Sequence, residues 1–159
     1  AMFTGCRIEE IAKLKPDDVR LVGKRYIISI REAKTKSGIR EIPISNAIHH
    51  VIAQRILNSE YLFPNGSNNT SGNRSDMYSK RFGRVKTKLG FDSSKVFHSI
   101  RKSFCTKLEQ AEVPESISAD LVGHFKASMT YGLYSGGSSI EAKVKAIDAV
   151  AYKIEQGEV

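Results

Sequence analysis

The chain has 159 residues, 40% of them hydrophobic and 26% charged, which predicts a single folded domain whose core needs no disulfides or metal. No apolar run is long enough to cross a membrane, no signal peptide opens the chain, and Cys6 and Cys105 form no disulfide framework or metal pattern, so we expect a cytoplasmic protein with reduced thiols. The formal net charge of +8 suits a DNA-binding surface, because phosphate contacts release condensed counterions, although many basic proteins simply carry solvated basic faces.

The first half of the chain predicts one helix followed by a small sheet. The helix is expected over residues 8–14, where apolar side chains recur at helical spacing, and Pro16 ends it because the residue before a proline disfavours the helical conformation. Strands are expected over residues 17–22, 25–31 and 39–44. The last strand alternates apolar with polar residues and returns from a turn at 34–38, which makes a β-hairpin with a basic tip.

The rest of the chain predicts helices separated by a polar loop. Ser45 suits the N-cap of a helix that runs to Leu57, and residues 64–75 form a loop rich in Gly and Asn. Further helices are expected over residues 76–89, 97–112, 114–122, 128–133 and 140–154. The first of them is basic, with an apolar side made by Met77, Phe82, Val85 and Leu89. The order of elements predicts a mixed α+β domain, mainly α-helical, with a small antiparallel three-stranded sheet.

Two residues near the start of the helix predicted over 97–112 suit a phosphate ligand. His98 and Arg101 are three positions apart, so their side chains share one face of the helix. Arg supplies a bidentate clamp for phosphate oxygens, and His donates or accepts a proton near neutral pH. An exposed polar pair on a helix is the more frequent explanation of this spacing taken alone.

A second candidate lies at the start of the chain. Gly5 lets the backbone approach a ligand closely just before a helix, and Arg7 lies in the first turn of that helix, whose N-terminus favours anions. Glu10 lies one turn further and could hold Arg7 in place. A capped surface helix with an ordinary Arg–Glu pair explains the same residues.

A histidine and two tyrosines complete the candidate chemistry. His124 follows Gly123 at the end of an apolar helix, where its imidazole could face a cleft, although a lone histidine is more often a core residue. Tyr134 and Tyr131 carry phenols, which act as nucleophiles once their proton is removed and positive charge stabilises the phenolate. Core packing of the rings, with hydroxyl groups reaching water, explains both tyrosines without chemistry.

Each of these patterns is weak by itself, but their order along the chain resembles the signature of the tyrosine recombinase (phage integrase) family. That signature comprises Thr-Gly-x-Arg-x-x-Glu, a lysine on a β-hairpin, His-x-x-Arg, Gly-His and a tyrosine. In this sequence the pieces correspond to residues 4–10, 34–38, 98–101, 123–124 and Tyr134. The resemblance spans nearly the whole chain and implies the catalytic-domain fold of that family.

The resemblance implies how the phosphate would be held and how the leaving group would be protonated. Arg7 and Arg101 would clamp the non-bridging oxygens of the scissile phosphate, where charge accumulates in the transition state. Lys34, with Lys36 as the alternative on the hairpin, would protonate the leaving 5′ oxygen. Glu10 corresponds to the acidic support residue of the family.

The resemblance also implies a nucleophile and its proton acceptor. Tyr134, with Tyr131 as the alternative, would attack the phosphate and form a 3′-phosphotyrosyl bond. His98 would accept the tyrosine proton, and His124 would hydrogen-bond the phosphate. The phosphotyrosyl bond conserves the energy of the phosphodiester, so neither ATP nor a metal or other cofactor is expected, and the sequence has no metal-ligand cluster.

The resemblance further implies a context for the chain. We expect residues 1–159 to form one catalytic domain that is a fragment, without the upstream helices and the N-terminal DNA-binding domain usual in the family. Residues 138–159 would form a C-terminal tail helix that docks on a neighbouring protomer or covers its own core. The expected partners are double-stranded DNA attachment sites and, on DNA, other protomers in a synaptic tetramer. A prophage or other mobile element in a bacterial host cell would be its setting.

Three other functions compete with a site-specific recombinase. A type IB topoisomerase-like activity would nick and reseal DNA without exchanging strands. A truncated, non-catalytic integrase remnant would only bind DNA. A plain basic DNA-binding module would explain the charge but leave the ordered motifs to chance.

Overall fold

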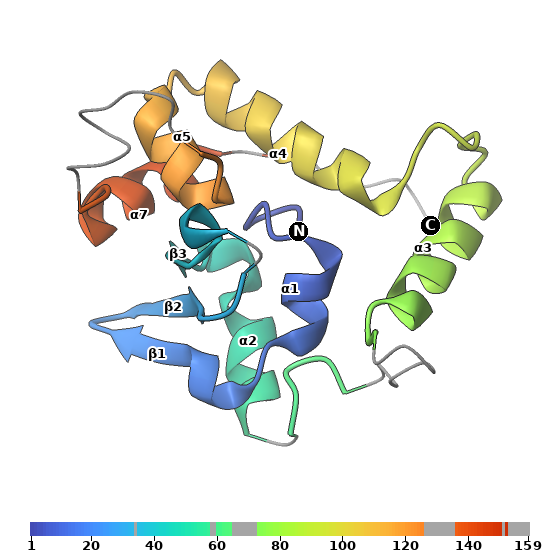
Figure 1. Ribbon diagram of the computed structural model, residues 1–159, viewed down its shortest axis with the longest axis horizontal. Coiled ribbons are helices and arrows are strands. Elements are labelled where there is room, and N and C mark those ends of the chain that lie inside the picture. The colour runs from blue at the N-terminus through green and yellow to red at the C-terminus, as the bar shows by residue number, and fades with distance from the viewer. Residues whose placement is uncertain (34, 58–59, 65–72, 126–135, 151, 153–159) are drawn as a thin grey trace.

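The computed structural model describes residues 1–33, 35–57, 60–64, 73–125, 136–150 and 152. In this part of the chain one helix precedes a three-stranded sheet, and the remaining helices follow it (Figure 1). The strands are β1 (Val19–Val22), β2 (Arg25–Ile30) and β3 (Arg40–Pro43). The helices are α1 (Ile8–Lys13), α2 (His49–Ile56), α3 (Asp76–Lys88), α4 (Phe97–Gln110), α5 (Glu115–Val122) and α7 (Ile140–Ala149). The prediction of a mainly α-helical α+β domain with a small antiparallel three-stranded sheet is confirmed.

The sheet has β2 at its centre. Its order is β1-β2-β3, and both neighbouring pairs of strands are antiparallel. Ile30 at the end of β2 pairs with Arg40 at the start of β3, which fixes the register of the predicted hairpin. Successive side chains on a strand point to opposite faces, yet the adjacent Ile27 and Ile28 are both buried. Both faces of the central strand are therefore covered.

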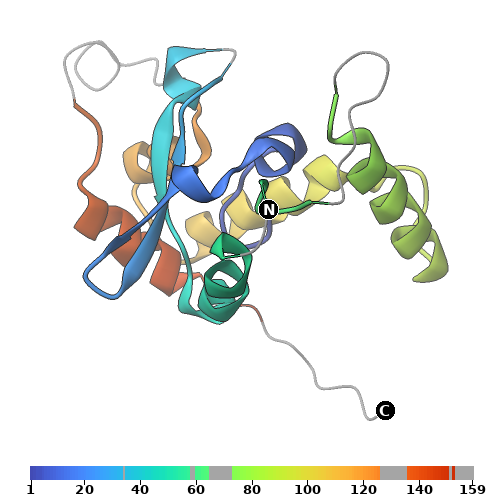
Figure 2. The ribbon, with the colours of Figure 1, turned by 90° about the horizontal axis from the view of Figure 1, so that it is seen from below.

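Helices supply that cover. α5 and α7 contact β3, whereas α2 contacts β2 (Figure 2). α4 crosses the domain and buries Phe104 and Leu108 against apolar side chains of the sheet and of α5 and α7. Ser45 accepts a hydrogen bond from the Ala47 N–H at 3.3 Å and caps the 3₁₀ turn Asn46–Ile48. Ser45 is therefore a cap, as predicted, but of this turn, and α2 itself begins at His49 with Ile48 as its N-cap. No helix in the described ranges combines the length and apolarity needed to span a membrane.

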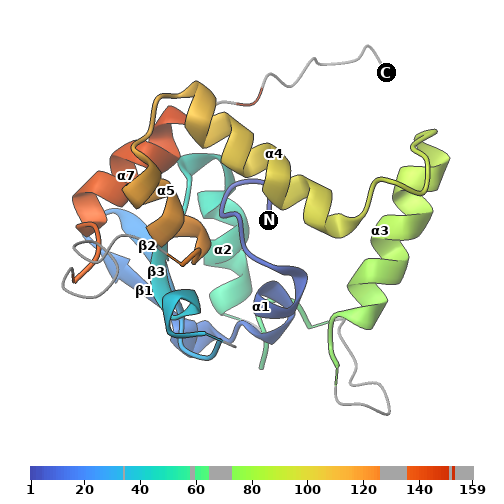
Figure 3. The ribbon, with the colours of Figure 1, turned by 45° about the horizontal axis from the view of Figure 1, so that its top comes forward.

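α3 lies at the edge of the domain, away from the sheet (Figures 1 and 3). It contacts α1 and α4, and the Phe82 ring meets the Phe97 ring of α4 edge to face, with centroids 5.5 Å apart. The helix is where the sequence predicts it, but its apolar side is not a buried face. Only Phe82 is half-buried, whereas Met77, Val85 and Leu89 are exposed.

The strand predicted over residues 17–22 begins later than expected. Pro16–Asp18 form a 3₁₀ turn, because Pro16 takes its first position and the Asp18 carboxylate accepts a hydrogen bond from the Lys15 N–H at 2.9 Å. Such a local side-chain bond competes with strand pairing. The strand therefore starts at Val19.

The returning strand of the hairpin differs from the predicted alternation. Ile39 is 57% exposed, whereas the neighbouring Arg40 is only 7% exposed. The charged side chain of Arg40 therefore points inward at the start of β3, whereas the apolar side chain of Ile39, just before the strand, points out. The reason lies in the partners of Arg40, described with the candidate site below.

The C-terminal helix is shorter than predicted within the described residues. α7 begins after Ser139, whose side chain caps it by accepting a hydrogen bond from the Ala142 N–H at 3.1 Å, and it ends at Ala149. α7 packs on β3, α5 and α4 of its own chain. The helix predicted over residues 128–133 and most of the loop predicted over 64–75 lie outside the described residues, and the division into a catalytic domain with a tail at 138–159 stays a prediction.

Two leucines at the ends of their helices test which helix faces form the core. Leu108 is 0% exposed and Leu89 is 67% exposed. Leu108→Ala is expected to lower the free energy of unfolding by about 2–5 kcal/mol, because it leaves a cavity, and Leu89→Ala by less than about 0.5 kcal/mol. Urea unfolding followed by circular dichroism measures both, since the chain has no tryptophan. Equal losses would contradict this assignment of the core.

Candidate active site

Candidate side chains from the starts of two helices meet at one pocket. A pocket of about 240 Å³ opens between the start of α1 and the start of α4. Its lining residues are Cys6, Arg7, Ile8, Glu9, Phe97, His98 and Arg101. Two arginines and a histidine that the sequence singles out, Arg7, Arg101 and His98, therefore share one cavity although they are up to 94 residues apart in sequence.

The backbone at Gly5 makes this convergence possible. Gly5 has φ +62°, and a Cβ placed on it would lie 2.6 Å from the Phe104 ring and 2.9 Å from the Val122 side chain. Only glycine adopts this conformation and tolerates this approach without strain. The segment before α1 can therefore lie directly on α4 and α5, which brings Arg7 close to the helix that carries Arg101.

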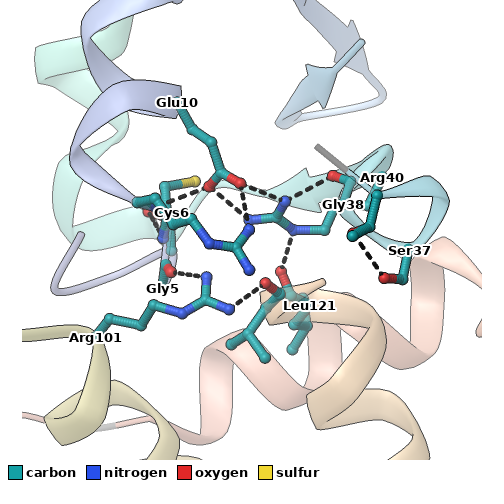
Figure 4. A network of polar contacts seen from close by, with 12 residues as sticks. Gly5, Cys6, Glu10, Ser37, Gly38, Arg40, Arg101 and Leu121 are labelled. Atoms are coloured by element: carbon teal, nitrogen blue, oxygen red, sulfur yellow. Dashed lines mark hydrogen bonds and ion pairs between the residues drawn. The ribbon is translucent and has the colours of Figure 1, made fainter. Parts of the chain in front are cut away.

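Arg101 is fixed by backbone carbonyl groups. Its Nη1 donates a hydrogen bond to the Gly5 carbonyl at 2.6 Å, and its Nη2 donates to the carbonyl of Val122 (Figure 4). The side chain is buried, and desolvation followed by the positive charge of the neighbouring Arg7 lowers the pKa of its guanidinium. The alternative explanation from the sequence, an exposed polar pair on a helix, is therefore wrong for Arg101. His98, one turn earlier, is exposed.

Arg7 is held by Glu10, as its spacing predicts. The Arg7 backbone N–H donates to Glu10 Oε2 at 2.7 Å, and Arg7 Nη1 donates to Glu10 Oε1 at 2.8 Å. The Arg7 side chain remains 43% exposed, whereas that of Glu10 is only 8% exposed. The carboxylate is thus an internal anchor, and the guanidinium that it anchors still reaches solvent at the pocket.

A third arginine, which none of the sequence patterns singles out, lies at this site. Arg40 donates to both Glu10 oxygens, from Nη1 at 3.0 Å and from Nη2 at 2.9 Å. Its other bonds go to backbone carbonyls, from Nη1 to Gly38 at 2.7 Å and from Nε to Leu121 at 2.8 Å (Figure 4). In the sequence Arg40 stands beside Glu41 in the strand predicted over 39–44, and no local pattern marks it as buried. These bonds explain why Arg40 rather than Ile39 points inward.

The two arginines keep the Glu10 carboxyl group ionised. Burial by itself raises the pKa of Glu10, but the hydrogen bonds and charge of Arg40, with the hydrogen bonds of Arg7, outweigh it and hold the pKa below the usual range. Glu10 is therefore a carboxylate at neutral pH and balances part of the positive charge gathered around the pocket.

His124 lies where α5 ends. The helix ends at Gly123, which has φ +71°, and the imidazole that follows is exposed rather than part of the core. Desolvation lowers the pKa of His124, and the positive charges of Arg101 and Arg7 lower it further. The imidazole is therefore neutral at neutral pH, and a neutral imidazole carries one N–H donor and one acceptor nitrogen.

The remaining candidates fall on or beside residues that the structure does not describe. Lys36 is exposed at the start of the 3₁₀ turn Lys36–Gly38, between β2 and β3. Lys34, Tyr131 and Tyr134 lie outside the described residues, so their roles stay predictions. Among the residues that are described, no group of three or more His, Cys, Asp or Glu side chains could hold a metal ion.

Comparison with protein families gives one clear match. Residues 1–137 match the sequence profile of the phage integrase family, which covers most of the chain. A comparison with curated proteins finds no match. The family assignment therefore rests on the profile, and similar solved structures bear on the fold.

Three solved structures resemble the fold. The integrase from mycobacterium phage Brujita superposes with a TM-score of 0.69 at 17% identity, over 98% of this chain and 51% of that one. The integrase of transposon Tn1549, in complex with circular intermediate DNA, gives 0.62 at 23% identity, over 89% of this chain and 54% of that one. The XerH site-specific recombinase bound to palindromic difH substrate, a post-cleavage complex, gives 0.60 at 24% identity, over 82% and 38%. The chain thus spans roughly half the length, or less, of these structures.

Gly5 offers a test of the close packing beneath the pocket. Gly5→Ala is expected to lower the free energy of unfolding by more than about 2 kcal/mol, because it combines left-handed strain with overlap on Phe104. Gly23→Ala is the matched control, because Gly23 has φ +60° but its Cβ would meet nothing within 4 Å. Gly23→Ala should lower the free energy of unfolding by only about 1–2 kcal/mol, the strain of an alanine in the left-handed conformation. Urea unfolding that gives both variants the same loss would contradict the packing at Gly5.

The ionised state of Glu10 predicts how stability depends on pH. A lowered pKa in the folded state contributes stability above the unfolded-state pKa, near 4.5, and this contribution is lost as pH falls through the folded-state pKa. Glu10→Gln should be less stable than wild type by about 3 kcal/mol at pH 7, because it leaves Arg40 buried without its carboxylate, and the difference should shrink in acid.

The control for this experiment is Glu109→Gln, which removes an exposed carboxylate on α4. Unfolding by urea is measured for the three proteins between pH 7 and pH 3. A deficit of the Glu10 variant that stays constant over this range would contradict the pairing described here.

Proposed function

The chain belongs to the phage integrase family of tyrosine recombinases, and from that premise we propose that it cleaves and rejoins DNA strands through a 3′-phosphotyrosyl intermediate. One observation carries the proposal: Arg7, Arg101 and His98 line a single pocket, with His124 close enough for both arginines to lower its pKa. Positioned cations of this kind suit a phosphodiester that gains negative charge in the transition state.

The arginines are arranged before any substrate binds. Arg7 is anchored by Glu10, and Arg101 by the carbonyls of Gly5 and Val122. Guanidinium groups fixed in this way need little reorganisation when a phosphate arrives, and reorganisation is a large part of the cost of stabilising new charge. In the proposal these two groups bind the non-bridging oxygens of the scissile phosphate.

The proposed reaction transfers a phosphoryl group and balances its protons. The Tyr134 oxygen attacks phosphorus while the bond from phosphorus to the 5′ oxygen breaks, and the energy of the phosphodiester is conserved. His98 accepts the tyrosine proton, and Lys34 gives a proton to the leaving oxygen. Lys36 is the alternative donor and Tyr131 the alternative nucleophile. Reversal, with a 5′ hydroxyl as the attacking group, rejoins the strand.

His124 serves this scheme as a neutral donor. Its lowered pKa follows from desolvation and from the arginine charges beside it. A neutral imidazole can donate its N–H to a phosphate oxygen without adding a further positive charge beside the arginines. In the proposal His124 completes the set of donors around the phosphate.

Duplex DNA is the proposed partner. The net charge of +8 supports it, and the XerH and Tn1549 structures that share the fold are complexes with DNA. We propose attachment sites of a phage or other mobile element as the target, with exchange carried out by four protomers. The reaction in the proposal uses neither a metal ion nor ATP.

A nicked suicide duplex that carries the attachment site of the encoding element tests the reaction. After cleavage a short 5′ product diffuses away, so a covalent protein–DNA complex should accumulate and appear as a slower band on a denaturing gel. Tyr134→Phe should abolish the band because it removes the attacking oxygen, and Tyr131→Phe should keep it. The reverse pattern would move the nucleophile to Tyr131.

A longer chain from the same gene, where the gene encodes one, is assayed beside the 159-residue chain, because the match covers only 38% of the XerH structure. DNA binding without a covalent band from either protein would overturn the proposal and leave a DNA-binding remnant. A band with no exchange between paired sites in a synapsis assay would favour topoisomerase-like nicking and resealing.

A further inference from the structure

Arg40 joins three elements that each carry or adjoin a candidate catalytic residue. Its side chain is only 3% exposed, and its hydrogen bonds reach Glu10 of α1, Gly38 of the turn before β3, and Leu121 near the end of α5. The signature that identifies the family in the sequence does not include it. Arg40 is not among the residues that line the pocket, and each of its hydrogen bonds goes to another group of the protein.

The first connection runs through Glu10 to Arg7. Arg40 binds both oxygens of the Glu10 carboxylate, at 3.0 and 2.9 Å. The same two oxygens accept the bonds from the Arg7 backbone and from its guanidinium, at 2.7 and 2.8 Å. A carboxylate held by a bidentate arginine has one orientation, and that orientation decides where the Arg7 guanidinium lies.

The second connection runs to the hairpin turn. Arg40 Nη1 donates to the Gly38 carbonyl at 2.7 Å, which fixes the turn Lys36–Gly38 against the body of the domain. Both candidate lysines, Lys34 and Lys36, belong to this connection between β2 and β3. The bond therefore limits where Lys36 can lie relative to Glu10.

The third connection runs to the end of α5, which leads into His124. Arg40 Nε donates to the Leu121 carbonyl at 2.8 Å. A Cβ on Gly123 would lie 3.0 Å from Arg40 Nη1 and 3.1 Å from its Cδ, so the backbone that leads to His124 rests directly on the Arg40 side chain. The same Cβ would lie 3.0 Å from the Ser37 carbonyl oxygen, so the turn and the end of α5 meet around this arginine.

A buried guanidinium is a costly way to fill this space unless its position matters. Removing an arginine from water costs several kcal/mol, and apolar side chains of similar volume often replace buried ion pairs without loss of stability. The partners of Arg40 are 2, 30 and 81 residues away in sequence. An apolar side chain could pack there but could not set these distances.

We propose that Arg40 is a positioning residue for strand cleavage, which sets the Arg7 guanidinium, the turn Lys36–Gly38 and the His124 backbone relative to one another. The proposal rests on the proposed function, because it concerns the geometry of the same pocket. Arg40 acts through Glu10, Gly38 and Leu121 and touches no reacting atom. Its loss therefore changes the rate of the chemical step and leaves DNA affinity nearly unchanged.

The test compares Arg40→Met and Arg40→Lys with Arg20→Met in the suicide-duplex assay. Met keeps the length of the side chain without its donors, and Lys keeps the charge but cannot bind both Glu10 oxygens and two carbonyls. Arg20→Met is the matched control, because it removes one arginine of the same sheet, whose side chain is 48% exposed and paired with Glu41. Single-turnover cleavage at saturating DNA and the Kd for DNA are measured for each.

Arg40→Met should slow covalent-complex formation by about 100-fold and Arg40→Lys by about 10-fold, since displacements near 1 Å cost about this much. Arg20→Met should stay within about twofold, and all three Kd values should stay within about threefold of wild type. Circular dichroism melts show which variants are folded at the assay temperature. If Arg40→Met is unfolded there, Arg40→Lys carries the test.

The outcomes separate the two proposals. No covalent complex from wild type would overturn the proposed function and this inference with it. A wild-type complex, together with folded Arg40 variants that cleave as fast as Arg20→Met, would overturn the inference alone. A loss of DNA affinity that accounts for the whole rate change would also overturn it, because the effect would then lie in binding rather than in positioning.

Discussion

The Glu10 carboxylate, shared between two arginines, is the interaction on which the site depends. It is almost fully buried, and a buried carboxylate is tolerated only when cations and hydrogen bonds replace its water. Arg40 from β3 and Arg7 from the start of α1 together supply those bonds. Moving α1 away from β3 would leave the buried Arg40 without its carboxylate, so the placement of α1 against the sheet and the geometry of the pocket are set by the same contacts.

Backbone carbonyls play the corresponding part for Arg101. Its two bonds go to Gly5 and Val122, at the ends of two segments that would otherwise present unpaired carbonyl groups to the interior. Two glycines with positive φ make this possible, Gly5 by lying on Phe104 and Gly123 by lying on Arg40. Gly5 and Gly123 of the family signature therefore allow the segments to pack closely, whereas Arg7 and Arg101 of the signature line the pocket. Each set needs the other, because the close approach of the backbones creates the carbonyl positions that hold the guanidinium groups.

α3 depends on the same region although it lies at the edge of the domain. Ser75, just before the helix, donates a hydrogen bond to the Glu9 carboxylate of α1 at 2.6 Å. Arg74 stacks on the Tyr61 ring, 3.5 Å from its centroid, and donates to the Ala12 carbonyl. Tyr78 of α3 donates a hydrogen bond to the Phe63 carbonyl, and the Phe82 ring of α3 meets Phe97 at the start of α4. This basic helix is therefore oriented by polar and aromatic contacts with residues 60–64, α1 and α4, rather than by a hydrophobic face of its own.

The sequence by itself determined the features that arise from neighbouring residues. Helical periodicity located α1, α3 and α4, β-branched runs located the strands, and the spacings of Arg7 with Glu10 and of His98 with Arg101 follow from one helical turn. The order of these short patterns was enough to indicate the family, since each pattern depends on local geometry.

Only the tertiary structure decided that Arg40 is buried and that the apolar side of α3 is exposed. Both depend on partners far away in sequence: Arg40 is held by groups 30 and 81 residues away, and no side chain in the described part of the chain covers Leu89. Periodicity records which residues share a face, whereas burial is decided by which elements meet, and a charged side chain goes inward where distant carbonyls and a carboxylate satisfy its donors.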